Sequence, residues 1–310
     1  MPLAAAEGRP APDRVPLYQE ITDRIIAELE AGIVPWVQPW GRSEVGAGLG
    51  LPRNAATSRC YSGINVLILW GALFQRGFAS QSWLTRRQAL ALGGHVRKGE
   101  AGTMIVYAAR FTPRLGRIAA RGGDKSGTIP FLKRFIVFNT DQCEGLPAHL
   151  VTTPPPIPQG LILPQAEALI RATGATFRIG GERALYSPAQ DIIQVPRPDS
   201  YFEPVNWHRT ALHELGHWTG HPSRLARDQS GDFGSKKYGQ EELVAEMTSA
   251  FTCASLGIVP TVRHADYIGS WLEVLKDDNR AIVRAAGAAS KAADYLLSFR
   301  PGSGGEDGPV

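Results

Sequence analysis

The sequence has 310 residues, 43% hydrophobic and 20% charged, with a formal net charge of +4, which excludes a disordered chain and favours two folded domains. No stretch approaches the ~18 consecutive apolar residues of a membrane span, and no signal peptide is recognisable, so we expect a cytoplasmic protein without a membrane partner. Three scattered cysteines, Cys60, Cys143 and Cys253, have no CxxC spacing, which argues against disulfides or a thiolate zinc site, and we expect buried thiols.

The first part of the chain has the pattern of three helices. Residues 1–12 are small and Pro-containing, and we expect a flexible N-terminus there. An extended, Gly-rich stretch from Pro35 to Gly50 separates the first helix from the second. Apolar spacing and end signals predict helices from Leu17 to Gly32, from Gly63 to Gln75, and from Thr85, as N-cap, to Gly93.

Two strands follow, joined by a long basic connection. Thr103–Phe111 and Phe131–Asn139 are rich in β-branched and aromatic residues, so they predict strands able to pair antiparallel. The connection, Thr112–Thr128, is longer than a hairpin needs, which predicts a mobile basic arm. Its basic residues are Arg114, Arg117, Arg121 and Lys125.

A Pro-rich run divides the chain. Residues 147–164 favour stiff polyproline II, so they predict a linker between domains at 13–146 and 165–299, with a flexible tail at 300–310. The second domain is predicted to be α+β, like the first. Its predicted strands are Thr176–Ile179, Leu185–Tyr186 and Ile192–Val195, and its predicted helices are Ala166–Ala172, Pro204–Thr219, Gln240–Leu256, Tyr267–Leu275 and Arg280–Leu297.

Charge is distributed unevenly along the chain. Residues 1–147 hold 18 of the 33 Lys and Arg residues and 11 of the 29 Asp and Glu residues. The remainder of the chain therefore holds 15 basic and 18 acidic residues. Between Arg53 and Arg134 the count is 14 basic against 2 acidic residues. Such a bias is expected where a surface meets phosphates, whereas the alternative is a solvated basic surface that aids solubility.

Residues 213–217, His-Glu-Leu-Gly-His, form the pattern HExxH inside a predicted helix. Residues four apart on a helix lie one turn above each other, so His213 and His217 can reach one ion. A catalytic zinc site takes three protein ligands and one water molecule, and Glu214 is placed to act as general base toward that water. The alternative is an amphipathic helix whose histidines pack or face water.

The third ligand has to come from another segment. Glu242 and Glu246 lie four apart on one face of the predicted helix Gln240–Leu256, so we assign Glu242 to the metal and Glu246 to orienting a ligand histidine. Glu241 is the reserve ligand, because a small rotation of the helix would bring it to the ion. His221 is a weaker rival, since it follows His217 by four residues rather than the six of the metzincin pattern. We expect zinc, with manganese as the alternative metal.

These motifs resemble the plasmid-borne antirestriction proteins of the ArdC family and a segment of some plasmid primases. The resemblance runs from about Tyr18 to Leu297. Its landmarks in order are Pro35-Trp36, Pro39-Trp40, Asn54, Tyr61 to Asn65, Trp83 to Thr85, Gly93 to Glu100, Val137 to Gln142, His213 to His221, Arg224-Leu225 and Tyr238 to Glu246.

The resemblance implies an N-terminal domain that binds single-stranded DNA and a gluzincin-like metallopeptidase domain in which His213, His217 and a glutamate hold the metal. Single-strand binding uses basic residues for the backbone and aromatic planes for the bases. The aromatic rings have core packing as their alternative. The residues we select for DNA binding are Trp36, Trp40, Arg53, Arg59, Tyr61, Arg86, Arg87, Arg97 and Lys98.

Three hypotheses about function follow. In the first, an antirestriction protein grips incoming, conjugated single strands while its zinc site cleaves a host protein or holds structure. In the second, the protein acts by occluding DNA, and the metal contributes stability alone. In the third, it is a regulatory metalloprotease that its basic domain recruits to DNA-bound targets.

Overall fold

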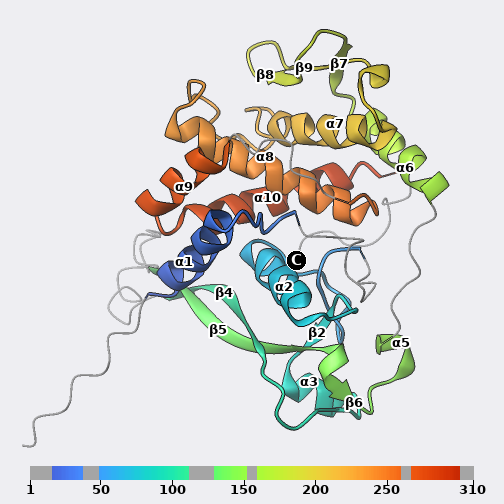
Figure 1. The fold of residues 1–310 in the computed structure, drawn as a ribbon, viewed down its shortest axis with the longest axis vertical. Helices are drawn as coiled ribbons and strands as arrows, with labels where there is room; N and C mark the ends of the chain where they lie inside the picture. The colour runs from blue at the N-terminus through green and yellow to red at the C-terminus, as the bar shows by residue number, and fades with distance from the viewer. Residues whose placement is uncertain (1–15, 38–48, 112–128, 152–158, 260–266, 301–310) are drawn as a thin grey trace, which may run out of the picture.

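The computed structural model describes residues 16–37, 49–111, 129–151, 159–259 and 267–300 (Figure 1). Several predictions made from the sequence concern residues outside these ranges. They are the two flexible termini, Trp40, the basic arm at 112–128 and the middle of the Pro-rich linker. The described residues form a mixed helix and strand structure, as the sequence predicts. None of the described helices is long and apolar enough to cross a membrane.

The three N-terminal helices form where apolar spacing predicts them. Ile21, Ile25 and Leu29 bury one stripe of the first helix, and Thr85 closes a capping box with Gln88 at the start of the third. The helices are α1 (Leu17–Glu30), α2 (Ile64–Arg76) and α3 (Arg86–Ala91).

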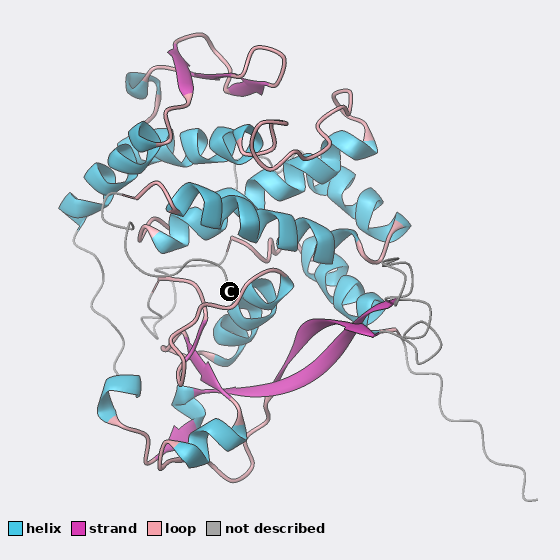
Figure 2. Ribbon diagram, turned by 180° about the vertical axis from the view of Figure 1, so that it is seen from behind, coloured by secondary structure: helices cyan, strands magenta, loops and turns pink. Residues whose placement is uncertain are grey.

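A four-stranded sheet lies beside α2, in the order β1-β2-β5-β4. Its main part is the predicted antiparallel pair, whose register runs from Thr103 opposite Val137 to Phe111 opposite Ile129. Two strands too short to leave a sequence pattern complete this sheet, and another pair, β3 and β6, forms a separate ribbon (Figure 2). The strands are β1 (Arg53–Asn54), β2 (Ser82–Leu84), β3 (His95–Val96), β4 (Thr103–Phe111), β5 (Ile129–Asn139) and β6 (Cys143–Glu144).

The Pro-rich linker is shorter than predicted. A short helix, α5 (Ala148–Val151), follows its start, and α6 (Gln159–Ala172) contains Pro164. The prediction that the linker extends to residue 164 is therefore wrong. Proline removes one backbone donor from a helix, and the exposed Pro164 is tolerated because Ala166 and Leu169 anchor the following turns in the core.

In the C-terminal part a small sheet lies above the helix Pro204–Trp218, in the view of Figure 1. In this sheet the central strand, β9, pairs in parallel with β7 and antiparallel with β8. The helix predicted at Gln240–Leu256 begins one turn earlier, at Lys236, because Ser235 accepts a hydrogen bond from the Tyr238 amide. The elements are β7 (Thr176–Ile179), β8 (Leu185–Ser187), β9 (Ile192–Val195), α7 (Pro204–Trp218), α8 (Lys236–Ser255), α9 (Ile268–Asp277) and α10 (Ala281–Leu297).

One hydrophobic core joins the two halves of the chain. It contains residues of α1 and α2 together with residues of α8, α9 and α10. Trp36 meets Trp271 with ring centroids 5.2 Å apart, and Trp70 meets Phe251 at 5.7 Å. The segments on either side of the linker therefore pack against each other, which no local pattern in the sequence indicates.

The cysteines are less buried than predicted. Cys253 is buried, as predicted, and Cys143 is half-buried, but Cys60 is exposed next to β1. The prediction that all three thiols are buried is therefore wrong, because Cys60 is bridged to Arg53 at the edge of the sheet and faces solvent. All three are free cysteines.

Candidate metal centre

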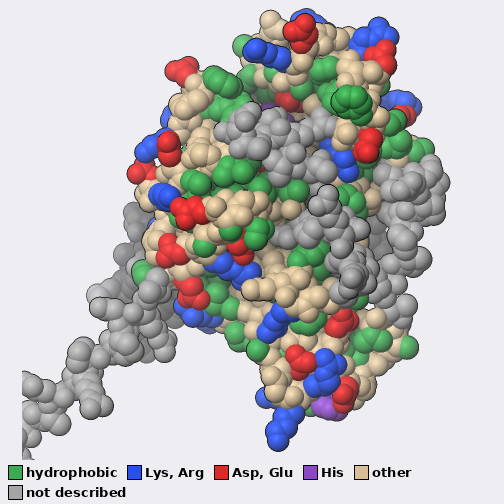
Figure 3. Space-filling view, viewed as in Figure 1, with side chains coloured by type: hydrophobic (Ala, Val, Ile, Leu, Met, Phe, Trp, Pro, Cys, Tyr) green, Lys and Arg blue, Asp and Glu red, His purple; other side chains and the backbone are tan. Residues whose placement is uncertain are grey.

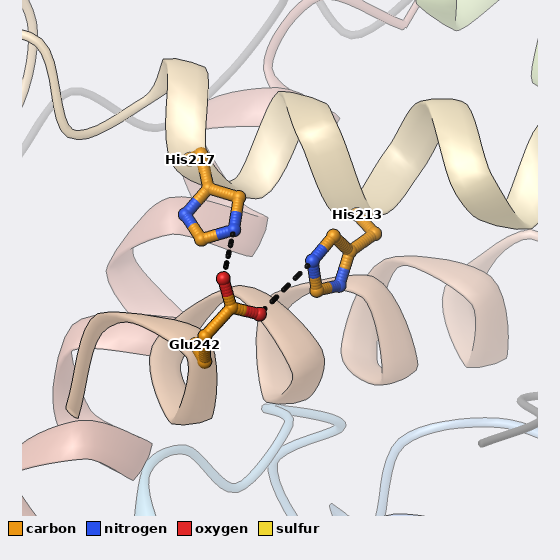
Figure 4. Close-up of side chains that lie close together, drawn as sticks. All are labelled: His213, His217 and Glu242. Atoms are coloured by element: carbon orange, nitrogen blue, oxygen red, sulfur yellow. Dashed lines mark ion pairs between the residues drawn. The ribbon is translucent and has the colours of Figure 1, made fainter. Parts of the chain in front are cut away.

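The two histidines of the HExxH motif share the buried face of α7. They lie one helical turn apart, and their ring centroids are 5.0 Å apart at an interplanar angle of 80°. His213 is buried and His217 is nearly so. Both rings point toward α8, the helix that packs across α7 (Figure 4). The predicted helical spacing thus brings two imidazoles to one side of the helix.

Glu242 of α8 lies between the two rings. One carboxylate oxygen is 3.5 Å from Nε2 of His213, and the other is 3.4 Å from Nε2 of His217 (Figure 4). The candidate ligand atoms of the three residues all lie within 4.8 Å of one another. Two imidazole nitrogens and a carboxylate oxygen form a donor set that zinc accepts, so these residues fit a bound divalent ion.

Gly216 allows the two helices to approach closely enough for this arrangement. A Cβ atom at this position would lie 3.1 Å from both the Cα and the carbonyl oxygen of Ala245 in α8. Such contacts are tighter than packing between helices normally permits, and the neighbour is backbone that cannot move aside cheaply. The glycine inside the motif therefore sets the distance between the histidines and Glu242.

Each histidine has a second carboxylate on its other ring nitrogen. Oε1 of Glu246 is 3.7 Å from Nδ1 of His213, in the place predicted for an orienting residue. Oε1 of Glu241 is 3.5 Å from Nδ1 of His217. The prediction of Glu241 as a reserve ligand is wrong for this arrangement, because its oxygen faces Nδ1, on the opposite side of the ring from Glu242.

Two residues of the loop after α7 hold Glu241 in place, and neither is part of a sequence motif. Arg227 donates to Glu241 at 2.6 and 3.0 Å and to the Gly216 carbonyl at 2.7 Å. Gln229 donates to the same carboxylate at 3.0 Å and to the His217 carbonyl at 2.7 Å. A lone arginine and glutamine in a loop match no motif, so only the three-dimensional contacts reveal their role.

Replacement of Arg227 by methionine is expected to weaken metal binding about 10- to 100-fold, the usual effect of losing an outer partner of a ligand histidine. The change frees the Glu241 carboxylate to turn away from Nδ1 of His217. Competition with a chelating indicator measures the affinity. Arg197→Met, which removes an exposed ion pair with Asp199, is the control. Equal affinities for both variants would contradict a role for Arg227.

The carboxylates also change the acidity of the cluster. Burial lowers the pKa of His217, but Glu242 and Glu241 outweigh burial and raise this pKa well above its ordinary value. Burial raises the pKa of Glu242, and the two histidines more than reverse that effect, so its pKa is held below its ordinary value. The cluster therefore favours protonated imidazoles beside an ionised carboxylate, and cation binding displaces those protons.

A cavity of about 880 Å³ opens beside the cluster. His213, Glu214 and Glu246 line one wall, and Tyr238 and Tyr267, whose hydroxyls are 3.2 Å apart, line another. Glu214 is only 5% exposed. Glu214 is thus a buried carboxylate at the cavity wall, next in sequence to a candidate ligand.

His221 lies outside the cluster. Its Nδ1 is 2.7 Å from the hydroxyl of Ser223, a local contact after the end of α7. Among the described residues, the group that can hold a metal consists of His213, His217 and Glu242. His221 is therefore not the third member of this group.

The residues predicted to bind DNA differ in their exposure to solvent. Trp36 is 0% exposed, so its prediction as a stacking residue is wrong: it packs on Trp271 instead of presenting a plane to solvent. Tyr61 is half-buried and Arg97 pairs with Glu100 at 2.7 Å. Figure 3 shows basic and acidic side chains interspersed on one face of the molecule. Four predicted residues are exposed, namely Arg59, Arg86, Arg87 and Lys98, and Arg53 is half-buried.

Two family models match the chain. The N-terminal domain of anti-restriction factor ArdC matches residues 16–138, and a zincin-like metallopeptidase matches residues 164–288. Together with the geometry above, these matches define a protein that has a zincin-like metallopeptidase domain behind an ArdC-type N-terminal domain.

Solved structures narrow this class to one family. The antirestriction ArdC protein from the R388 plasmid, in its Mn(II)-bound structure, is 39% identical with a TM-score of 0.75, and the match covers 92% of this chain and 98% of that one. Its metal-free structure has the same identity and TM-score, with coverage of 91% and 97%. The chain belongs to the ArdC family of antirestriction proteins.

Curated relatives have a similar level of identity. The uncharacterized protein y4eC of Sinorhizobium fredii (strain NBRC 101917 / NGR234) is 38% identical over 301 residues, 92% of this chain and 94% of the relative. A DNA primase TraC of Escherichia coli is 37% identical over 302 residues, 92% of this chain and 27% of the primase. The chain thus spans about a quarter of that primase.

Proposed function

We propose that this protein binds single-stranded DNA and hydrolyses a peptide bond at a divalent metal site, and that it thereby protects conjugated DNA from host restriction. The observation that carries the metal site is the convergence of Nε2 of His213, Nε2 of His217 and the Glu242 carboxylate within 4.8 Å. Zinc is the metal that this donor set favours, and manganese is the alternative. The Mn(II)-bound structure of the R388 relative supports a divalent ion.

The bound ion supplies a positive charge that polarises a carbonyl group and lowers the pKa of a water molecule. His213, His217 and Glu242 would hold it. The carboxylates of Glu246 and Glu241 lie 3.7 and 3.5 Å from Nδ1 of His213 and His217, where their charge favours the present ring orientations. Glu214 would take a proton from a water molecule as the water oxygen bonds to the carbonyl carbon, and would deliver that proton to the amine nitrogen as the C–N bond breaks. Substitution of Glu214 by glutamine tests this role, because glutamine cannot accept that proton.

The proposed partners are single-stranded DNA and a host protein substrate, such as a restriction enzyme or another DNA-bound protein. The basic excess between Arg53 and Arg134, 14 residues against 2, supports the nucleic acid as partner. Arg86, Arg87 and Lys98 are exposed and available to phosphates. Cytoplasmic location remains a prediction of the sequence.

Charge reversal of two exposed basic residues tests the DNA partner. Arg87→Glu with Lys98→Glu is expected to weaken binding of a labelled oligothymidylate and to reduce the slope of log affinity against log salt by about 1.4, since each neutralised phosphate contributes roughly 0.7. Fluorescence anisotropy at several salt concentrations measures both. The matched control is Arg171→Glu with Arg178→Glu, two exposed basic residues of the C-terminal part. An unchanged slope in the first variant would remove these residues from the binding surface.

A further inference from the structure

The outer part of the β4–β5 pair exposes two aromatic rings side by side. Tyr107 is 62% exposed and Phe135 is 45% exposed. Their ring centroids are 6.3 Å apart, with the ring planes at 90°. Adjacent exposed rings offer a flat apolar surface on which a binding partner can stack.

The register of the strands places a positive charge on the same face. Tyr107 lies opposite Lys133, and Ile105 lies opposite Phe135. Because residues directly opposite one another, and residues two apart along a strand, share one face of a sheet, Tyr107, Phe135 and Lys133 point the same way. Lys133 is exposed. We name these three residues the hairpin platform.

The apolar side chains on the inner part of this face pack in the hydrophobic core, whereas those on the outer part do not. Ile105 and Val137 are buried and pack with Leu69 and Leu73 of α2. Tyr107 and Phe135 lie further along the strands and stay outside that core cluster. Their rings therefore contribute exposed apolar area that the described core does not need.

The chemistry of the platform matches a single strand of nucleic acid. Unpaired bases stack on exposed rings and the backbone phosphates bind nearby cations, so two rings beside a lysine satisfy both requirements. The same strands lead in sequence into residues 112–128, which carry four basic residues and one acidic residue. Two rings offer far less area than the roughly 800 Å² per partner of a stable protein interface, which argues against a second copy of this chain.

We propose that Tyr107 and Phe135 stack on the bases of single-stranded DNA while Lys133 contacts its backbone. This site rests on the proposed DNA-binding function and replaces the buried Trp36 as the aromatic contact. It is distinct from the metal cavity, whose lining residues include neither ring.

The test is equilibrium binding of a fluorescein-labelled oligothymidylate to the full chain. Tyr107→Ala and Phe135→Ala are each expected to weaken binding by about 5- to 150-fold, the range that corresponds to one lost stack. Tyr107→Phe keeps the ring and is expected to bind like the unchanged protein. A duplex of the same length offers no free base faces, so its weaker binding should not respond to Tyr107→Ala.

Matched variants separate the outcomes. Phe202→Ala removes an exposed ring of the C-terminal part and should leave binding unchanged. Thermal unfolding of each variant checks that the fold is retained.

If the unchanged protein binds no oligothymidylate, the DNA-binding function itself fails. If it binds and both alanine variants bind equally well, the platform is wrong while the function stands. A dimer that dissociates in the alanine variants at unchanged DNA affinity would also overturn the proposal.

Discussion

Replacement of Glu242 by glutamine is expected to lower the affinity for Zn²⁺ by well over the ~100-fold upper bound for the loss of an outer partner. The amide has no charge to offset that of the ion, and the two histidines alone leave the site one protein ligand short of the usual three. Glu242 lies between both rings, at 3.4 and 3.5 Å from their Nε2 atoms, so no other described carboxylate of the cluster substitutes for it without moving.

Metal content and competitive titration measure this effect. The unchanged protein should hold one divalent ion per chain after dialysis against a weak chelator, and Glu242→Gln should hold none. Glu246→Gln should fall between them, with a loss of about 10- to 100-fold, because its carboxylate lies 3.7 Å from Nδ1 of His213 and outside the candidate ligand group. Glu273→Gln, an exposed glutamate of α9, serves as control. Retention of stoichiometric metal by Glu242→Gln would refute the proposed ligand set.

Glu214→Gln is expected to abolish peptide hydrolysis while metal binding is retained. Loss of a general base costs typically 10²–10⁴-fold in rate, and glutamine preserves the size of the buried side chain. Glu214 lines the cavity but does not belong to the candidate ligand group, so the affinity for zinc should change little. Glu182→Gln, which changes another glutamate of the cavity wall, is the matched control.

Protection of unmodified DNA entering a restricting host connects this chemistry to function. If hydrolysis is required, Glu214→Gln should protect no better than an empty plasmid, and Glu182→Gln should protect fully. Full protection by Glu214→Gln at unchanged metal content would favour occlusion of DNA with a structural ion. Loss of protection in the hairpin platform variants alone would point to the same conclusion.

Local patterns predicted most elements because each depends on its own residues. The apolar stripe of α1, the β-branched runs of β4 and β5 and the HExxH spacing in α7 all encode their geometry within one segment. The four-residue spacing of Glu242 and Glu246 also predicted one carboxylate for the metal and one for orienting a histidine, and in the structure both carboxylates lie beside His213, although the metal itself stays a proposal.

Local patterns did not predict contacts between segments that are distant in the sequence. Trp36 lies among prolines, glycines and arginines, a setting typical of a surface, yet it is buried and packs against Trp271 of α9. Arg227 reaches Glu241 across the turn between α7 and α8, and no spacing rule links those two residues. In both cases the contact is made with a residue of another element, so the sequence around either residue does not predict it.

The tryptophan pair has a consequence for communication within the molecule. Trp36 belongs to the N-terminal half, but it also forms part of the wall of the cavity beside Glu214. A ligand that displaces this ring changes the free energy of both halves at once. Binding equilibria are reciprocal. If bound nucleic acid changes the affinity for a peptide through this ring, bound peptide changes the affinity for nucleic acid by the same factor.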